Sequence, residues 1–249
     1  MKHFKPASTA LAIVLLAGGP VAAQAPTQWT GFVAPNDRVE VVNIRGTIHA
    51  VVSTDGMVRV NARPSDPSVM RVDVVEHAGG VKVCALPVER SGGANGRCTS
   101  DERGPWPRLN EADIRVDIEV SVPEGVRLSA TSVAGEVRVE QLRSDVNVTM
   151  VSGRVLVESA GFPARITSVS GDVRIEVPAN ANADFHATTL SGAINSDVPI
   201  SSGRRNVRLP DGQRLFDGHG PQNVRATLGS GGPELQVTTV SGGIELRQR

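Results

Sequence analysis

Hydrophobic and polar residues alternate through residues 129–192, and the alternation is centred on a recurring phrase, Thr-x-Val-Ser-Gly-x-Val. Apolar side chains stand at every second position on both sides of the glycine. This is the period of a β-strand and not of a helix. Glycine tolerates the positive φ angles that a sharp corner requires. The pattern therefore predicts short strands in pairs, with a corner at each Ser-Gly.

The phrase recurs at five glycines, and the first three are 18 residues apart. A fixed period with fixed offsets is typical of stacked repeats. It predicts an all-β fold, a β-solenoid (β-helix-like) in which each unit lies one strand spacing from the last. A β-sandwich of hairpins is the alternative. The repeat positions, a threonine and the glycine four residues later, are Thr131 and Gly135, Thr149 and Gly153, Thr167 and Gly171, Thr188 and Gly192, and Thr238 and Gly242.

An aliphatic residue stands two positions before each glycine, and we expect it to point into the core. This requires the inward side of the strand to change near the threonine, because apolar residues also stand five positions before the glycine. A bulge at the threonine would produce the change. These aliphatic residues are Val133, Val151, Val169, Leu190 and Val240.

The chain divides into three parts. Residues 1–23 carry two lysines, an apolar run and small residues before Gln24, which predicts a secretory signal peptide. Residues 24–37 are expected to be a flexible leader. Residues 38–249 are expected to form one solenoid domain, which begins with a degenerate glycine phrase around Gly46 and has loop insertions at 87–110 and 195–225. The sequence of the mature chain contains no second long apolar run, so no transmembrane segment is predicted there.

Charge and cysteine content narrow the possible functions. Loss of Lys2 and Lys5 with the signal peptide leaves 24 of the 26 basic residues against 26 acidic ones. Such a balance argues against nucleic acid as a partner. Cys84 and Cys98 lie 14 residues apart, and in an exported chain a disulfide between them is the expectation. A free pair or a metal site is the alternative, which no CxxC motif or neighbouring histidine pair supports.

Two pairs of residues resemble acid–base partners. Polysaccharide-cleaving β-helices need paired acid and base groups, and Asp184 with His186 and Asp217 with His219 come nearest to that requirement. Each pair is more simply read as turn or loop residues. We therefore predict no catalytic residues.

Three glutamates stand five positions after their glycines: Glu140, Glu158 and Glu176. As a ladder of carboxylates they would suit a divalent cation. Arg138 and Arg174 stand on the same face and would neutralise them. The prediction is a solvated face of mixed charge, with no metal and no cofactor.

The phrases resemble a known family. Residues 122–126 (Val-Pro-Glu-Gly-Val), the Thr-x-Val-Ser-Gly-x-Val repeats, and Gly-Ser-Gly-Gly at 229–232 followed by Thr-Val-Ser-Gly at 239–242 look like the bacterial "putative adhesin" domain. That family is a domain of unknown function, similar to the head domains of autotransporter adhesins. The resemblance covers residues 38–249. It implies a β-helix-like fold and a location in the cell envelope, and it implies no catalytic residues.

These observations predict an exported, non-enzymatic, adhesin-like scaffold or binding domain of the cell envelope, with the periplasm as the favoured compartment and secretion or the cell surface as the others. An envelope protein or a glycan is the expected partner, and end-to-end self-association through a free solenoid end is a further expectation. A glycan-acting enzyme and a purely structural stalk are the alternatives.

Overall fold

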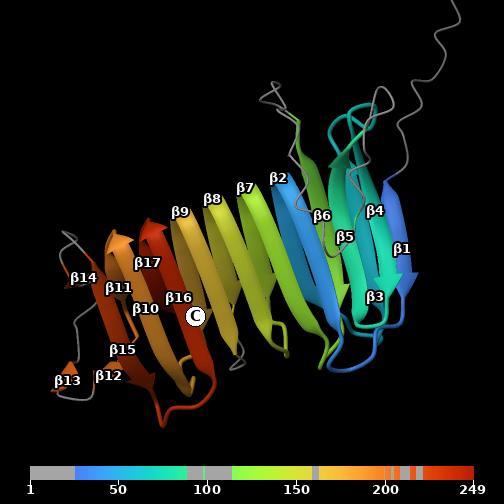
Figure 1. Ribbon diagram of the computed structural model, residues 1–249. Coiled ribbons are helices and arrows are strands. Elements are labelled where there is room, and N and C mark those ends of the chain that lie inside the picture. The colour runs from blue at the N-terminus through green and yellow to red at the C-terminus, as the bar shows by residue number, and fades with distance from the viewer. Residues whose placement is uncertain are drawn as a thin grey trace, which may run out of the picture.

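The computed structural model describes residues 26–88, 98, 114–158, 163–198 and 221–249, and the backbone of residues 200–202, 205–207 and 214–216 (Figure 1). These residues form strands and turns and contain no helix. The expected signal peptide and most of the insertion at 87–110 lie outside the described residues. The strands are β1 Thr27–Gly31, β2 Arg38–Val52, β3 Val58–Pro64, β4 Met70–His77, β5 Gly80–Pro87, β6 Val116–Val122, β7 Arg127–Glu140, β8 Val146–Glu158, β9 Ala164–Val177, β10 Ala183–Ser191, β11 Ile194–Ser196, β12 Ile200–Ser202, β13 Arg205–Val207, β14 Arg214–Phe216, β15 Gln222–Leu228, β16 Glu234–Ser241 and β17 Ile244–Gln248.

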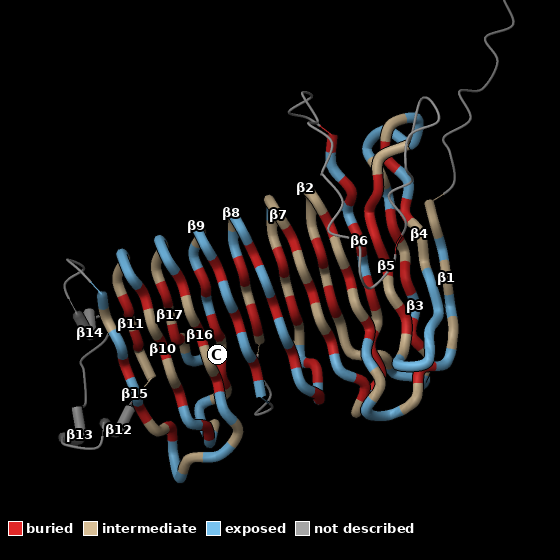
Figure 2. The backbone as a smooth tube through the Cα atoms, viewed as in Figure 1, coloured by how far each residue is buried: buried red, intermediate tan, exposed pale blue. Residues whose placement is uncertain are grey.

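The four long strands β2, β7, β8 and β9 each run through two halves with a glycine between them. In β8 the buried side chains are Val146, Val148 and Met150 before the glycine, and Val155 and Val157 after it. The inward side therefore changes parity at the Ser-Gly corner, where the chain turns from one face of the coil to the other. Both halves contribute to one hydrophobic core. Figure 2 shows the buried and exposed residues alternating along these strands.

The first halves of the long strands form what we call the first face, and the second halves form the second face. On the first face the strand order is β4, β5, β2, β7, β8, β9, β16, β10, β15, β12, β13. On the second face it is β1, β3, β6, β2, β7, β8, β9, β17, β11, β14. The expected all-β, solenoid-like fold is confirmed.

The glycines of the repeat lie in one column, in the spatial order Gly46, Gly135, Gly153, Gly171, Gly242, Gly192. A Cβ atom on Gly153 would lie 2.0 Å from the carbonyl oxygen of Gly135, and one on Gly171 would lie 2.1 Å from that of Gly153. Each coil therefore packs its backbone against the glycine of the next. Gly153 also has a φ of 134°, which other residues rarely adopt. The corner at Gly153 favours glycine both because the neighbouring backbone is so close and because φ is positive.

The coils do not follow one another in simple sequence order. Strands β16 and β17 lie between β9 on one side and β10 and β11 on the other, and they are parallel to both neighbours. Thr238 is thus paired with Thr167 and with Thr188. The last two strands of the chain, residues 234–248, therefore do not lie at an end of the solenoid. They are enclosed because the same phrase gives β16 matching edges on both sides.

The N-terminal end of the coil is closed by added strands. Strand β1 pairs antiparallel with β3, and β4 pairs antiparallel with β5. Trp29 of β1 packs on the core, and its indole Nε1 donates a hydrogen bond of 3.2 Å to the Glu76 carboxylate of β4. This contact joins the outermost strands of the two faces. The leader expected at 24–37 therefore contains a structural strand.

The two expected insertions have different outcomes. The insertion expected at 195–225 contains the short strands β12, β13 and β14 and the start of β15. In the other insertion, Cys98 is bonded to Cys84 of β5, which confirms the disulfide. The two cysteines form a small cluster with Leu86, against which Val42 packs.

The predicted direction of the aliphatic residues before the glycine is wrong. Val151, Val169, Leu190 and Val240 point to solvent, and the residues one position earlier are buried. No bulge is needed at the threonine, because the alternation continues unbroken to the third residue before the glycine. That position holds Asn43, Ser132, Met150, Ser168, Thr239 and Thr189 in spatial order.

Candidate functional site

A row of aliphatic side chains crosses the first face, one from each of five neighbouring strands. In spatial order its members are Val133, Val151, Val169, Val240 and Leu190. The last four expose 44%, 47%, 46% and 54% of their surface. Large apolar side chains exposed in a continuous row are characteristic of interaction surfaces, whereas single ones need no explanation.

A row of threonines runs beside the aliphatic row, two residues earlier in each strand. The register pairs Thr131, Thr149, Thr167, Thr238 and Thr188 in that spatial order. Neighbouring members are therefore about 4.8 Å apart, the spacing of paired strands. At the β15 end, the Asn223 side-chain amide donates a hydrogen bond of 3.0 Å to the Thr188 hydroxyl. We call the two rows together the Thr–Val face.

Charged residues lie along one border of the Thr–Val face, near the starts of the strands. Arg38 of β2 and Arg127 of β7 are paired in register at one end. Asp184 of β10 and Glu234 of β16 are paired in register at the other end. A shallow hollow of about 290 Å³ follows this border from β2 to β16. The border thus changes from positive to negative along the coil axis.

The structure brings Asp184 and His186 to the same side of β10 and adds Glu234, which the sequence analysis did not single out. The His186 Nδ1 atom lies 3.7 Å from the Glu234 carboxylate, and the Thr227 hydroxyl donates a hydrogen bond of 3.3 Å to Asp184. The His186 and Glu234 side chains are 37% and 52% exposed. Solvent screens charges at such exposure, so the cluster lacks the enclosed setting in which acid–base groups are usually tuned. Residues 217 and 219 lie outside the described residues.

Glu140, Glu158 and Glu176 are side by side on the second face, as predicted from their spacing. Glu140 lies 3.1 Å from His49 and 3.4 Å from Arg138. The Arg249 guanidinium lies 2.6 Å from the Glu158 carboxylate. Among the described residues no group of three acidic, histidine or cysteine side chains is arranged to hold a metal ion.

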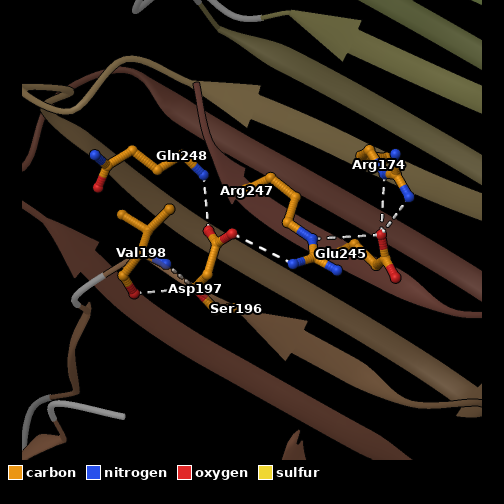
Figure 3. A network of polar contacts seen from close by, with 7 residues as sticks. All are labelled: Arg174, Ser196, Asp197, Val198, Glu245, Arg247 and Gln248. Atoms are coloured by element: carbon orange, nitrogen blue, oxygen red, sulfur yellow. Dashed lines mark hydrogen bonds and ion pairs between the residues drawn. The ribbon is translucent and has the colours of Figure 1, made fainter. Parts of the chain in front are cut away.

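The next coils of the second face continue this network of paired charges (Figure 3). The Glu245 carboxylate accepts a hydrogen bond of 2.9 Å from Arg174 and lies 3.6 Å from Arg247. A hydrogen bond from Arg247 to Asp197, together with the charge of Glu245, raises the pKa of Arg247 above its ordinary value. These contacts satisfy many charges of the second face within the chain, whereas the Thr–Val face presents uncharged side chains.

Sequence reasoning misses the Thr–Val face because it assigns the direction of each side chain, inward or outward, from hydrophobicity alone. The expectation that the aliphatic residue two positions before the glycine points inward follows from its hydrophobicity, whereas the structure buries the residue before it. Strict period-two alternation through Val146, Val148 and Met150 carried the correct signal.

An all-β coil of bent parallel strands with a continuous aliphatic core defines a solenoid-like repeat domain. Residues 108–247 match the family described as Toastrack DUF4097, which is more than half of the chain, and the chain belongs to this family. Among curated proteins no match is found. Within the described residues no helix is long and apolar enough to cross a membrane.

Solved structures give a likeness in fold. A "putative cell adhesion protein" from Clostridium sporogenes aligns with a TM-score of 0.53 at 11% identity, over 90% of this chain and all of that chain. A "putative adhesin" from Bacteroides fragilis aligns with a TM-score of 0.29 at 10% identity, over 91% of this chain and 98% of the other. The first alignment supports the fold assignment. The likeness to autotransporter adhesin heads stays a prediction.

Proposed function

We propose that this chain is an exported, non-enzymatic, adhesin-like binding domain of the bacterial cell envelope, and that the Thr–Val face makes its contact. The observation that carries the proposal is the aliphatic row, in which four side chains in register are each 44% exposed or more. The fold likeness to a protein described as a cell adhesion protein supports it. The 18-residue spacing of Gly135, Gly153 and Gly171 supports a regular repeat as the source of this surface.

The surface is suited to weak and repeated contact. Burying a fully exposed aliphatic side chain contributes about 1.5–3 kcal/mol, so each half-exposed member of the row offers about 1 kcal/mol. Four members offer about 4 kcal/mol, which is comparable to the low end of the 4–15 kcal/mol cost of association. One domain therefore binds weakly, and strong attachment needs many copies acting together.

The experiment compares two lysine substitutions. Val169→Lys places a charge in the middle of the aliphatic row, between Val151 and Val240. Val51→Lys is the matched control, since Val51 is an outward-facing valine on the second face, next to Glu140 in the register. Beads coated with residues 24–249 are tested for binding to envelope fragments of the bacterium that makes the protein.

Val169→Lys is expected to weaken bead binding at least 10-fold, because the lysine must be desolvated in an apolar contact. Val51→Lys is expected to bind like the native chain. Both variants are expected to keep the native melting temperature within a few degrees, since outward-facing substitutions usually change stability by less than about 0.5 kcal/mol. Equal binding by the native chain and Val169→Lys would refute the role of the Thr–Val face and favour a purely structural stalk.

The enzyme alternative has its own test. If the cluster around Asp184 and His186 cleaved a glycan, alanine at these residues would abolish cleavage. We expect no glycan cleavage by the native chain.

A further inference from the structure

We propose that the Thr–Val face binds the same face of a second copy of this chain. The inference rests on the proposed function, because it names the partner of the same surface. It commits to one arrangement, in which the second copy is rotated by half a turn about an axis that is parallel to the strands and passes between β8 and β9.

The geometry follows from the order of the strands. The first-face strands from β2 to β10 are all parallel, and their order is β2, β7, β8, β9, β16, β10. The rotation keeps the strand direction and reverses the order. It therefore places β8 over β9, β7 over β16 and β2 over β10 of the second copy. In the four central strands threonines then face threonines, and Val42 of β2 faces Thr188. Aliphatic residues face aliphatic residues, in two sheets packed about 10 Å apart.

The aliphatic row is complementary to itself under this rotation. Val151 faces Val169 of the second copy, and Val133 faces Val240. Ile44, which occupies the same repeat position in β2 and is half-buried, faces Leu190. The Thr–Val faces of the two copies have the same strand spacing. The half-turn rotation makes every contact twice in a symmetric dimer.

The charged border selects this position of the axis. Arg127 faces Glu234 of the second copy, Arg38 faces Asp184, and Glu40 faces His186, which lies in the same repeat position as Glu40. Moving the axis onto β9 would place Asp145 opposite Glu234, which is a like-charge contact. Moving it onto β8 would let Arg38 face Glu234, but it would place Asp145 opposite the Asp145 of the second copy and separate Arg127 from Glu234.

One like-charged contact lies at the outer edge of the arrangement. Lys82 of β5 faces Arg225 of β15 in the second copy. Lys82 lies 3.9 Å from Glu40, which offsets its charge within the chain. Cys84 of β5 points away from the core and is bonded to Cys98, so Cys98 covers the first face at β5 and limits the overlap to the six strands from β2 to β10.

The area is sufficient for a specific dimer. Six strands span about 29 Å, and eight residues of each first half span about 26 Å. The overlap is thus about 750 Å² per copy or about 1,500 Å² in total, within the roughly 1,200–2,000 Å² that specific interfaces bury.

Charge exchange tests the arrangement. The native chain, residues 24–249, is expected to dimerise in sedimentation experiments, and more weakly at high salt because the border is charged. Arg127→Glu and Glu234→Arg are each expected to weaken dimerisation at least 30-fold, since each opposes like charges twice in the dimer. The double variant is expected to recover the native dissociation constant within about threefold.

A mixture of the two single variants supplies the decisive measurement. A mixed dimer pairs Glu at 127 with Arg at 234 and keeps the native Arg127–Glu234 contact, so the mixture is expected to dimerise while each variant alone does not. Recovery in the mixture also shows that both variants are folded. Dimerisation unchanged in the single variants would overturn the proposal and indicate end-to-end association.

The two proposals fail in different ways. A native chain that stays monomeric at millimolar concentration overturns the dimer. If Val169→Lys still weakens binding to envelope fragments in that case, the Thr–Val face keeps its role with a different partner. If Val169→Lys changes neither measurement, the proposed function is wrong as well.

Discussion

Gly153→Ala should destabilise the coil at its corner. The added Cβ would lie 2.0 Å from the Gly135 carbonyl oxygen, a backbone atom that cannot move without shifting the neighbouring coil. The φ of 134° at this position adds strain for any side chain. Strained backbone costs about 1–3 kcal/mol, and overpacking that moves backbone costs about 1–3 kcal/mol more. We therefore expect a loss of about 2–6 kcal/mol.

The assay is thermal unfolding followed by circular dichroism. For a chain of this size each kcal/mol lowers the melting temperature by about 2–4 °C, so Gly153→Ala should lower it by roughly 4–24 °C. Gly56→Ala is the control, because Gly56 also has a positive φ, 75°, and a Cβ there would meet nothing within 4 Å. It should lose only the strain energy, about 1–2 kcal/mol. Equal losses in the two variants would refute the argument that contact between neighbouring coils dictates glycine.

Three further predictions concern the disulfide, the enclosed coil and the buried polar positions. Cys84→Ser should cost about 3 kcal/mol by removing the 14-residue closure to Cys98, and the difference from the native chain in melting temperature should vanish in reducing agent. Deleting residues 234–249 should abolish cooperative unfolding, since it removes the strands between β9 and β10; a deleted chain that melts like the native one would contradict the strand order. Ser168→Ala should change stability by less than about 1 kcal/mol, because its buried hydroxyl has no partner among the described residues. Asn43→Ala should cost about 1–3 kcal/mol, because the Asn43 amide donates a 2.8 Å hydrogen bond to the buried Val116 carbonyl. Urea unfolding of Ser168→Ala and Asn43→Ala measures the difference between their free energies of unfolding.

The repeat and its register were predictable because they depend on local rules. The offsets of Thr149 and Gly153 from the preceding Thr131 and Gly135 are fixed by the period, and strands stacked in register must align them. The degenerate phrase around Gly46 was recognisable for the same reason, and its glycine pairs with Gly135. The disulfide followed from the number and spacing of the cysteines.

The order of the coils was not predictable from the phrases. Residues 234–244 carry the same phrase as residues 184–194, so either segment matches the edge of β9 equally well in sequence. What decides between them is the antiparallel pairing of β10 with β15 and the turn that follows. In that turn, the Asn182 side chain accepts hydrogen bonds of 2.9 and 3.1 Å from the backbone and hydroxyl of Ser230. Such long-range contacts leave no periodic signal.

The candidate site was missed for a different reason. Val169 and Ser168 have the polarity expected of inside and outside positions, respectively, and the structure reverses both. Strand alternation decides the direction at this position, because the buried row holds side chains as different in size as Ser168 and Met150. The next residue, Val169, then points to solvent.

The position of β16 and β17 has a consequence for how the protein is made. During synthesis the chain emerges from β1 onward, so β9, β10 and β11 exist before the two strands that will separate them. Their inner edges cannot have their final neighbours until residues 234–248 have appeared. A ribosome paused before that point would hold a nascent chain whose two open edges bear nearly the same phrase, so chaperone protection at this stage would matter more than for a coil that grows in order.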